Sequence, residues 1–159
     1  MIDFRKSLMR GDLVYNHRNW ICPVFGMDAE TVTIIAQHYG EETFLLEDIH
    51  PIPLTEEIIL NLGWEEIGKN HPDYKKKIGV GKQFKHPWYT SSLIIRQNAL
   101  TDMYSTLNGE FVLRYLHDLQ HVLLHTVEDE IQYDYEKDEL LLLTGGSHKH
   151  RYQKKGIKQ

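Results

Sequence analysis

The strongest helical pattern in the chain is the stretch Phe111-Val-Leu-Arg-Tyr-Leu-His-Asp-Leu-Gln-His-Val-Leu-Leu-His125. On a helical wheel its apolar side chains fall on one broad arc, which predicts an amphipathic helix from about residue 110 to 127. The inward stripe consists of Val112, Leu116, Leu119 and Leu123. The histidines at positions 117, 121 and 125 fall on the opposite side of the wheel, so we expect all three to face solvent.

Histidines four residues apart on a helix form a known two-ligand metal arrangement. His117 and His121 are therefore weak candidates for a metal site, and for a metal-dependent enzyme as one reading of the chain. Three such histidines cannot all reach one ion, because two helical turns separate the outer pair by about 12 Å. The metalloprotease pattern His-Glu-x-x-His is not met, since Asp118 follows His117. We therefore predict no catalytic residue, no cofactor and a non-enzymatic protein.

Residues 1–52 contain short segments rich in β-branched, aromatic and aliphatic residues, separated by turn residues. The segments are 12–15, 20–22, 31–35 and 43–46. Short strands at this spacing favour a small antiparallel β-barrel or meander, and an SH3-like barrel fits the length.

A short connector helix follows at about residues 55–62, with Thr55 as its N-cap and Gly63 at its end. A second β portion comes next, in which 76–82 and 92–96 are the expected strands. The fold class is therefore α+β. We predict a barrel at 1–52, the connector helix with an α+β portion packed on the barrel at 53–144, and a basic disordered tail at 145–159.

Composition and charge limit the functions open to the chain. Of its residues 41% are hydrophobic, and the single cysteine, Cys22, excludes an internal disulfide. No apolar run is long enough to span a membrane, and the N-terminus lacks the pattern of a secretory signal, so we expect a cytoplasmic protein without a membrane partner. The net charge of −5 disfavours non-specific nucleic-acid binding over the whole surface.

One local strip nevertheless combines cations with aromatic residues, as single-stranded nucleic-acid sites do. Its candidate nucleic-acid-binding residues are Lys75, Lys76, Lys77, Lys82 and Lys85, with Tyr74, Phe84, Trp88 and Tyr89 close by. The alternative reading is a hairpin whose lysines face water while the aromatic rings lie in the core. A nucleic-acid-binding accessory protein is thus the second hypothesis, after a protein-interaction module with an unknown protein partner.

Two segments carry a resemblance to a known family. His50-Pro-Ile-Pro-Leu-Thr-Glu-Glu-Ile-Ile-Leu-Asn-Leu-Gly-Trp64 resembles a PIPLTEEILLKLGF-like motif, and Arg114-Tyr-Leu-His-Asp-Leu-Gln-His121 resembles a KYVHQLQNLYFALTG-like motif. The pair, in this order, is similar to small proteins abundant in Bacteroidetes genomes and their phages. That family carries no established activity, so the resemblance implies a phage or mobile-element setting rather than a chemistry.

The resemblance also separates the histidines. His117 belongs to the family pattern, whereas His121 and His125 stand where the pattern has an amide and small or apolar residues. This implies that a metal site is not a family-wide property. His117 and Gln120 are the better candidates for a shared polar contact, such as a hydrogen bond between the helix and the barrel.

Overall fold

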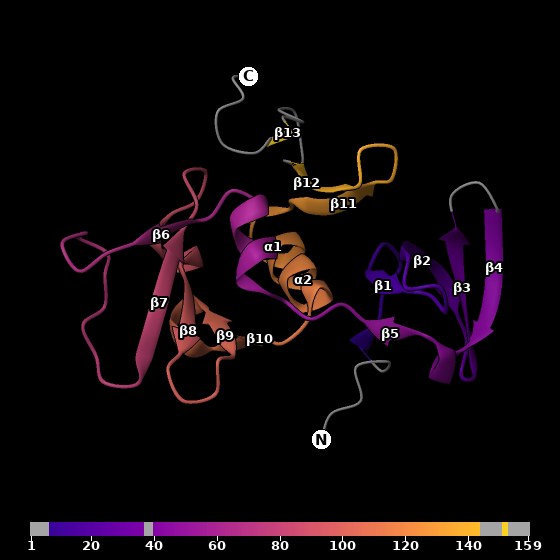
Figure 1. The fold of residues 1–159 in the computed structure, drawn as a ribbon, viewed down its shortest axis with the longest axis horizontal. Helices are drawn as coiled ribbons and strands as arrows, with labels where there is room; N and C mark the ends of the chain where they lie inside the picture. The colour runs from indigo at the N-terminus through magenta and orange to yellow at the C-terminus, as the bar shows by residue number, and fades with distance from the viewer. Residues whose placement is uncertain (1–6, 37–39, 144–150, 153–159) are drawn as a thin grey trace. The chain divides into compact units, whose positions relative to one another are not determined.

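The computed structural model describes residues 7–36, 40–143 and 151–152 (Figure 1). Its internal contacts divide the chain into two compact units. Unit 1 comprises Met1–Pro53 and Tyr115–Arg151, and unit 2 comprises Leu54–Arg114 and Tyr152–Gln159. The division into 1–52, 53–144 and 145–159 stays a prediction. The structure groups the residues in another way, because the principal helix belongs to the same unit as the N-terminal strands, and the predicted tail lies almost wholly outside the described residues.

Unit 1 contains an antiparallel sheet of five strands in the order β4-β3-β2-β1-β5. The strands are β1 (Leu13–Tyr15), β2 (Ile21–Met27), β3 (Thr31–Ala36), β4 (Gly40–Leu45) and β5 (His50–Pro51). The strands β1 to β4 overlap the four predicted segments, with ends that differ by up to five residues, and a 3₁₀ turn, η3 (Leu46–Asp48), precedes β5. In β3 buried and more exposed side chains alternate, since Val32, Ile34 and Ala36 are fully buried on one face.

The helix α2 (Leu116–Val127) completes unit 1 together with β11 (Glu130–Asp134) and β12 (Glu139–Leu143). A second sheet has the order β11-β12-β13, where β13 is Arg151–Tyr152. The predicted start of the helix at residue 110 is wrong. Tyr115 is the N-cap in an extended conformation, and its backbone N–H donates to the Asp118 carboxylate at 2.9 Å, which fixes the first turn at Leu116.

Unit 2 begins with the predicted connector helix, α1 (Glu56–Asn61), whose N-cap is Thr55. The Thr55 hydroxyl accepts a hydrogen bond from the Ile58 N–H at 3.3 Å. An antiparallel sheet follows in the order β10-β9-β8-β7-β6. Its strands are β6 (Glu65–Ile67), β7 (Val80–Lys85), β8 (Ile95–Asn98), β9 (Tyr104–Thr106) and β10 (Phe111–Leu113), with 3₁₀ turns η4 (Ser91–Leu93) and η5 (Leu107–Gly109).

The core of unit 2 is more aromatic than that of unit 1. Trp64 is buried, its indole N–H donates to the Leu93 carbonyl at 3.2 Å, and its ring lies 4.6 Å from that of His86. Val112 was predicted to pack inward from a helix, but it lies half exposed in the edge strand β10. An apolar run such as Phe111-Val-Leu113 suits a strand or a helix equally well, so periodicity could not decide between them.

The fold is therefore mixed, with few helices and mostly antiparallel sheets, as predicted in its coarse form. Among residues 7–36, 40–143 and 151–152 no sheet closes into a barrel. In that same part of the chain, no helix is long and apolar enough to cross a membrane.

Candidate functional site

The polar face of α2 is turned inward over part of its length. The His117 side chain is 0% exposed, that of His121 is 20% exposed, and only His125 is fully on the surface. The prediction that all three face solvent is therefore wrong for His117. The reason is that the segment leading into β1 lies along this side of the helix, and it contributes the polar atoms that buried helix side chains need.

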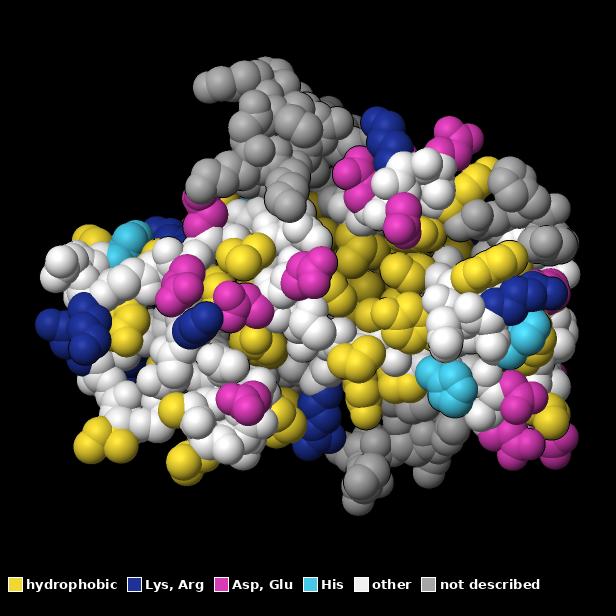
Figure 2. Space-filling view, in the orientation of Figure 1, with side chains coloured by type: hydrophobic (Ala, Val, Ile, Leu, Met, Phe, Trp, Pro, Cys, Tyr) yellow, Lys and Arg dark blue, Asp and Glu magenta, His cyan; other side chains and the backbone are white. Residues whose placement is uncertain are grey.

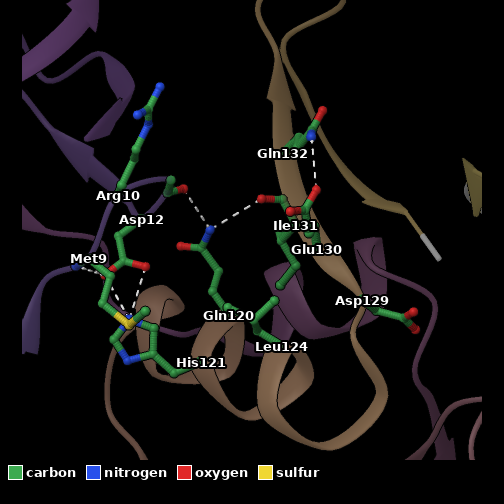
Figure 3. A pocket seen from close by; sticks show the side chains of 11 residues that line it. Met9, Arg10, Asp12, Gln120, His121, Leu124, Asp129, Glu130, Ile131 and Gln132 are labelled. Carbon is green, nitrogen blue, oxygen red and sulfur yellow. Dashed lines mark hydrogen bonds and ion pairs between the residues drawn. The ribbon is translucent and has the colours of Figure 1, made fainter. Parts of the chain in front are cut away.

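Gln120 joins α2 to two other elements of unit 1 (Figure 3). Its Oε1 accepts a hydrogen bond from the Leu13 N–H at 2.9 Å, and its Nε2 donates to the carbonyls of Gly11 at 3.1 Å and Ile131 at 3.2 Å. Because the side chain is almost completely buried, these three contacts replace water that it cannot reach. Gln120 is thus a cross-link between the backbones of β1 and β11.

Asp12 and His121 form an ion pair beside Gln120. His121 Nε2 lies 2.8 and 3.0 Å from the two carboxylate oxygens of Asp12, and the Met9 N–H donates to the same carboxylate at 2.7 Å. The hydrogen bond to Asp12 raises the pKa of His121 above its ordinary value. Figure 3 shows both side chains at the wall of a pocket of about 110 Å³.

His117 lies next to a hydroxyl without the order of a catalytic triad. Its Nε2 is 3.2 Å from Ser7 Oγ, and the Asp118 carboxylate lies 3.9 Å from that same nitrogen. In a Ser-His-Asp triad the carboxylate contacts the other ring nitrogen, where it orients the imidazole. Burial also lowers the pKa of His117 below its ordinary value. The arrangement therefore suits packing better than proton transfer.

The metal hypothesis is not supported by the placement of the histidines. The rings of His117 and His121 lie 5.6 Å apart, edge to face, and their Nε2 atoms contact Ser7 and Asp12 respectively. Within the described part of the chain, no group of three or more His, Cys, Asp and Glu side chains is placed to hold a metal ion.

The five predicted lysines of unit 2 divide into two sets. Lys75, Lys76 and Lys77 are exposed in the loop before β7. The other two are paired with carboxylates, since Lys82 Nζ lies 3.0 Å from Glu56 and Lys85 Nζ lies 2.6 Å from Asp73. Lys85 accordingly lowers the pKa of Asp73 through this hydrogen bond.

The aromatic residues near these lysines divide in a similar way. Phe84 and Tyr89 are buried, whereas Tyr74 and Trp88 are half buried. Buried rings cannot stack on bases, so the strip as a whole does not present the alternating cations and rings that the sequence suggested. What remains on the surface is the cationic loop 75–77.

A second polar network holds that loop on the sheet of unit 2. The Gln83 side chain accepts from the Lys75 N–H at 2.9 Å and donates to the Lys75 carbonyl at 2.8 Å. The Arg96 guanidinium donates through Nε to Gln83 at 3.0 Å and through an Nη to the Asp73 carbonyl at 3.3 Å. The register pairs Gln83 with Arg96 and Arg96 with Ser105, so the three side chains share one face of the sheet.

Sequence reasoning missed Asp12, Gln83 and Arg96. Each is a polar residue with an apolar strand residue next to it in the sequence, which is a weak sign of burial with a partner. The partner of Asp12 is His121, which lies more than 100 residues further along the chain. The partner of Gln83 is Lys75, which lies in a loop because β7 begins at residue 80 and not at residue 76 as predicted.

The strand β4 forms one end of the sheet of unit 1. All six of its residues are in register with β3, from Thr31 opposite Leu45 to Ala36 opposite Gly40. Among the strands that the structure describes, β4 pairs with β3 alone. Acidic side chains are visible at this end of the sheet (Figure 2). Glu41 and Glu42 belong to β4, and Glu47 and Asp48 belong to η3.

Compared with models of known protein families, with curated proteins and with solved structures, the chain matches none of them. The functional argument therefore rests on the geometry of the two units.

Proposed function

We propose that this chain is a non-enzymatic protein-interaction module that binds an extended, basic segment of a partner protein along strand β4. The observation that carries the proposal is the six-residue edge of β4, which is hydrogen-bonded to β3 on one side. An edge strand offers alternate backbone N–H and C=O groups to an added strand, and many recognition domains bind peptides in this manner.

The charge around β4 favours a basic partner. Glu41 and Leu45 are exposed on the strand, and Glu47 and Asp48 follow directly in η3. An added strand with Lys or Arg at alternate positions would meet these carboxylates, which increases the rate of association and selects against acidic partners. Arg18 lies 3.6 Å from Glu42, so Glu41 is the better choice for a test of charge.

We also propose a fold type for the N-terminal sheet, a cellular location and a genetic origin. The order β4-β3-β2-β1-β5, with a 3₁₀ turn before the short last strand, supports an SH3-like arrangement of the N-terminal sheet. We place the protein in the cytoplasm of a Bacteroidetes host, encoded by a phage or mobile element, on the two motifs at 50–64 and 114–121.

The test is a pull-down of tagged full-length chain from Bacteroidetes lysate, with one half treated with nuclease and both halves identified by mass spectrometry. The edge variant is Glu41→Lys, and the matched control is Glu136→Lys, because Glu136 is also exposed and lies in the turn between β11 and β12. We expect a stoichiometric partner that survives nuclease, and capture by the edge variant reduced about tenfold.

Each result has a definite meaning. Equal capture by Glu41→Lys and Glu136→Lys would remove β4 as the contact. Turnover of a small molecule at a defined pocket by the purified chain would overturn the non-enzymatic assignment. A partner without a basic segment would contradict the stated chemistry of the interaction.

The second candidate is a nucleic-acid-binding accessory protein, favoured by the three consecutive exposed lysines 75–77. Partners that vanish with nuclease would support it. Its affinity for a single-stranded oligonucleotide should fall steeply with salt and with reversal of these charges, because binding releases counterions from the phosphate backbone. An interaction insensitive to salt would exclude it.

A further inference from the structure

We infer that unit 2 contains a binding pocket for a phosphate monoester of about mononucleotide size, formed between the loop 75–80, strands β8 and β9 and the turn 107–109. This inference goes beyond the proposed function, because it concerns a different unit and a small ligand. The pocket has a volume of about 320 Å³, and every residue that lines it belongs to unit 2.

The lining is cationic and polar. Lys75, Lys77 and Arg96 supply three positive charges, and Asn98 and Asn108 are among the neutral residues that can donate hydrogen bonds. No Asp or Glu is among the lining residues of this pocket. By comparison, the charged lining of the pocket beside His121 in unit 1 is mixed, since Arg10 and His121 lie there with Asp12, Asp129 and Glu130. The pocket of unit 2 is therefore the one of the two whose charged lining is wholly cationic.

Arg96 is held in place before any ligand arrives. Its Nε donates to Gln83 and one Nη donates to the Asp73 carbonyl, both on the side of the loop. A guanidinium has five N–H donors, so three remain for a ligand after these two contacts. Partial burial also removes water from the guanidinium and lowers the pKa of Arg96, which makes an anionic partner more favourable.

The backbone shapes the opposite wall. Leu107, Asn108 and Gly109 have φ values of 52°, 57° and 89°, and Gly79 has a φ of 90° across the pocket. Left-handed backbone at residues other than glycine is uncommon, and here it brings Asn108 and Gly109 into the lining. A volume of about 320 Å³ lies at the lower end of the range for small-molecule sites, which fits one phosphate and a group of nucleoside size.

Phosphate suits this site better than a single carboxylate does. A phosphate monoester carries close to two negative charges at neutral pH and three acceptor oxygens. Three cations with several amide groups can compensate that charge, and an arginine fork binds phosphate oxygens through two parallel hydrogen bonds. Ile78 and Val80 add apolar surface for the remainder of the ligand.

The experiment is isothermal titration calorimetry of the full chain with AMP, adenosine and inorganic phosphate, at about 150 mM NaCl so that diffuse attraction is screened. The variant is Lys75→Gln with Lys77→Gln. The matched control is Lys76→Gln, because Lys76 lies between these residues in the same exposed loop and does not line the pocket. We expect AMP to bind, adenosine to bind at least about tenfold more weakly, and the double variant to lose about tenfold in affinity while the control keeps it.

A second comparison separates a small ligand from the phosphorylated end of a nucleic acid, which presents the same chemical group. A short oligonucleotide with a 5′-phosphate is titrated against the same sequence without it. Preference for AMP over both supports a small-molecule site, and preference for the 5′-phosphorylated strand assigns the site to nucleic-acid ends. Equal binding of both oligonucleotides without AMP binding, equal losses in Lys76→Gln and the double variant, or no binding of any probe would each overturn the inference.

Discussion

The two units differ in how far water can reach their main polar networks. In unit 1 the helix α2 brings Gln120 and His121 against the backbone and carboxylate of the segment before β1, and the contacts are largely closed to water. In unit 2 the sheet supplies the buried Gln83 and the half-buried Arg96, and their partners lie in the exposed loop that contains Lys75. The first network fixes the fold, and the second also leaves cations at the surface of a pocket. A polar network indicates binding only when part of it still faces water.

Removal of Gln120 should cause the largest loss of stability. Gln120→Ala leaves the Leu13 N–H and the Ile131 carbonyl without their partner in a buried site, and the Gly11 carbonyl in a partly buried one, at a cost of about 4 kcal/mol in the free energy of unfolding. Hydrogen exchange of the β1–β3 amides measures the effect within unit 1. The control Gln132→Ala, on the exposed face of β11, should cost less than about 0.5 kcal/mol. Equal effects would show that Gln120 does not cross-link the unit.

Acid should weaken unit 2 through His86. His86 is buried, the Trp88 N–H donates to its Nδ1, and its Nε2 must then donate to the Leu62 carbonyl at 3.0 Å. A second ring proton would break the first contact, and burial lowers the pKa of His86 from 6.5 to about 4. The folded pKa is below the unfolded one, so the stability is complete above pH 6.5 and is lost as the pH falls toward 4, by about 3 kcal/mol.

Proton NMR of the His86 ring checks this directly. Its chemical shifts should stay constant from about pH 7 to pH 5 and change only below that range. A midpoint near pH 6.5 would mean that the ring is hydrated and that the core around Trp64 is open. His86→Gln, which can keep one donor and one acceptor, should reduce the dependence of stability on pH between pH 4 and 6.5.

Removal of Gln83 should have a smaller effect than removal of Gln120, although both side chains make three hydrogen bonds. Gln83 is itself buried, but Gln83→Ala releases Lys75 in an exposed loop and the half-buried Arg96 in β8, and water can reach both. We therefore expect a loss of about 2 kcal/mol, confined to the amides of the loop 71–79. Hydrogen exchange locates the loss, and Lys76→Ala in the same loop is the control. A global loss as large as that of Gln120→Ala would remove the distinction between the two networks.

The sequence could predict the parts of the fold that depend on local pattern. Alternation in β3 and the Thr55 cap of α1 are visible in single segments, and the structure has both. The predicted start of the helix at residue 110 and the predicted exposure of His117 were wrong for the same physical reason. Helix propensity and periodicity describe an isolated element, whereas Tyr115 caps the helix through Asp118, and residues 7–13 cover its polar side from more than 100 positions away. Gln120, at the edge of the apolar arc on the side of the histidines, was the one local sign of that cover.

The smallest expected effect is the contribution of the half-buried His121 to the pH dependence of stability, which should be opposite in sign to that of the buried His86. The hydrogen bond to Asp12 raises the pKa of His121 above 6.5, so the charged imidazole stabilises unit 1 below the unfolded pKa, and this contribution is lost as the pH rises through the higher folded pKa. The pair is partly exposed and should contribute about 1 kcal/mol or less. NMR should give a midpoint for His121 above 6.5 in the native chain and a return toward 6.5 in Asp12→Asn. The slopes of stability against pH for the two histidines then have opposite signs, because the Asp12 carboxylate stabilises the charged form of His121, whereas burial disfavours the charged form of His86. A titration midpoint for His121 below 6.5 would contradict this prediction. It would mean that the effect of burial on the pKa of His121 is larger than that of the hydrogen bond to Asp12, as it is for His86 in unit 2.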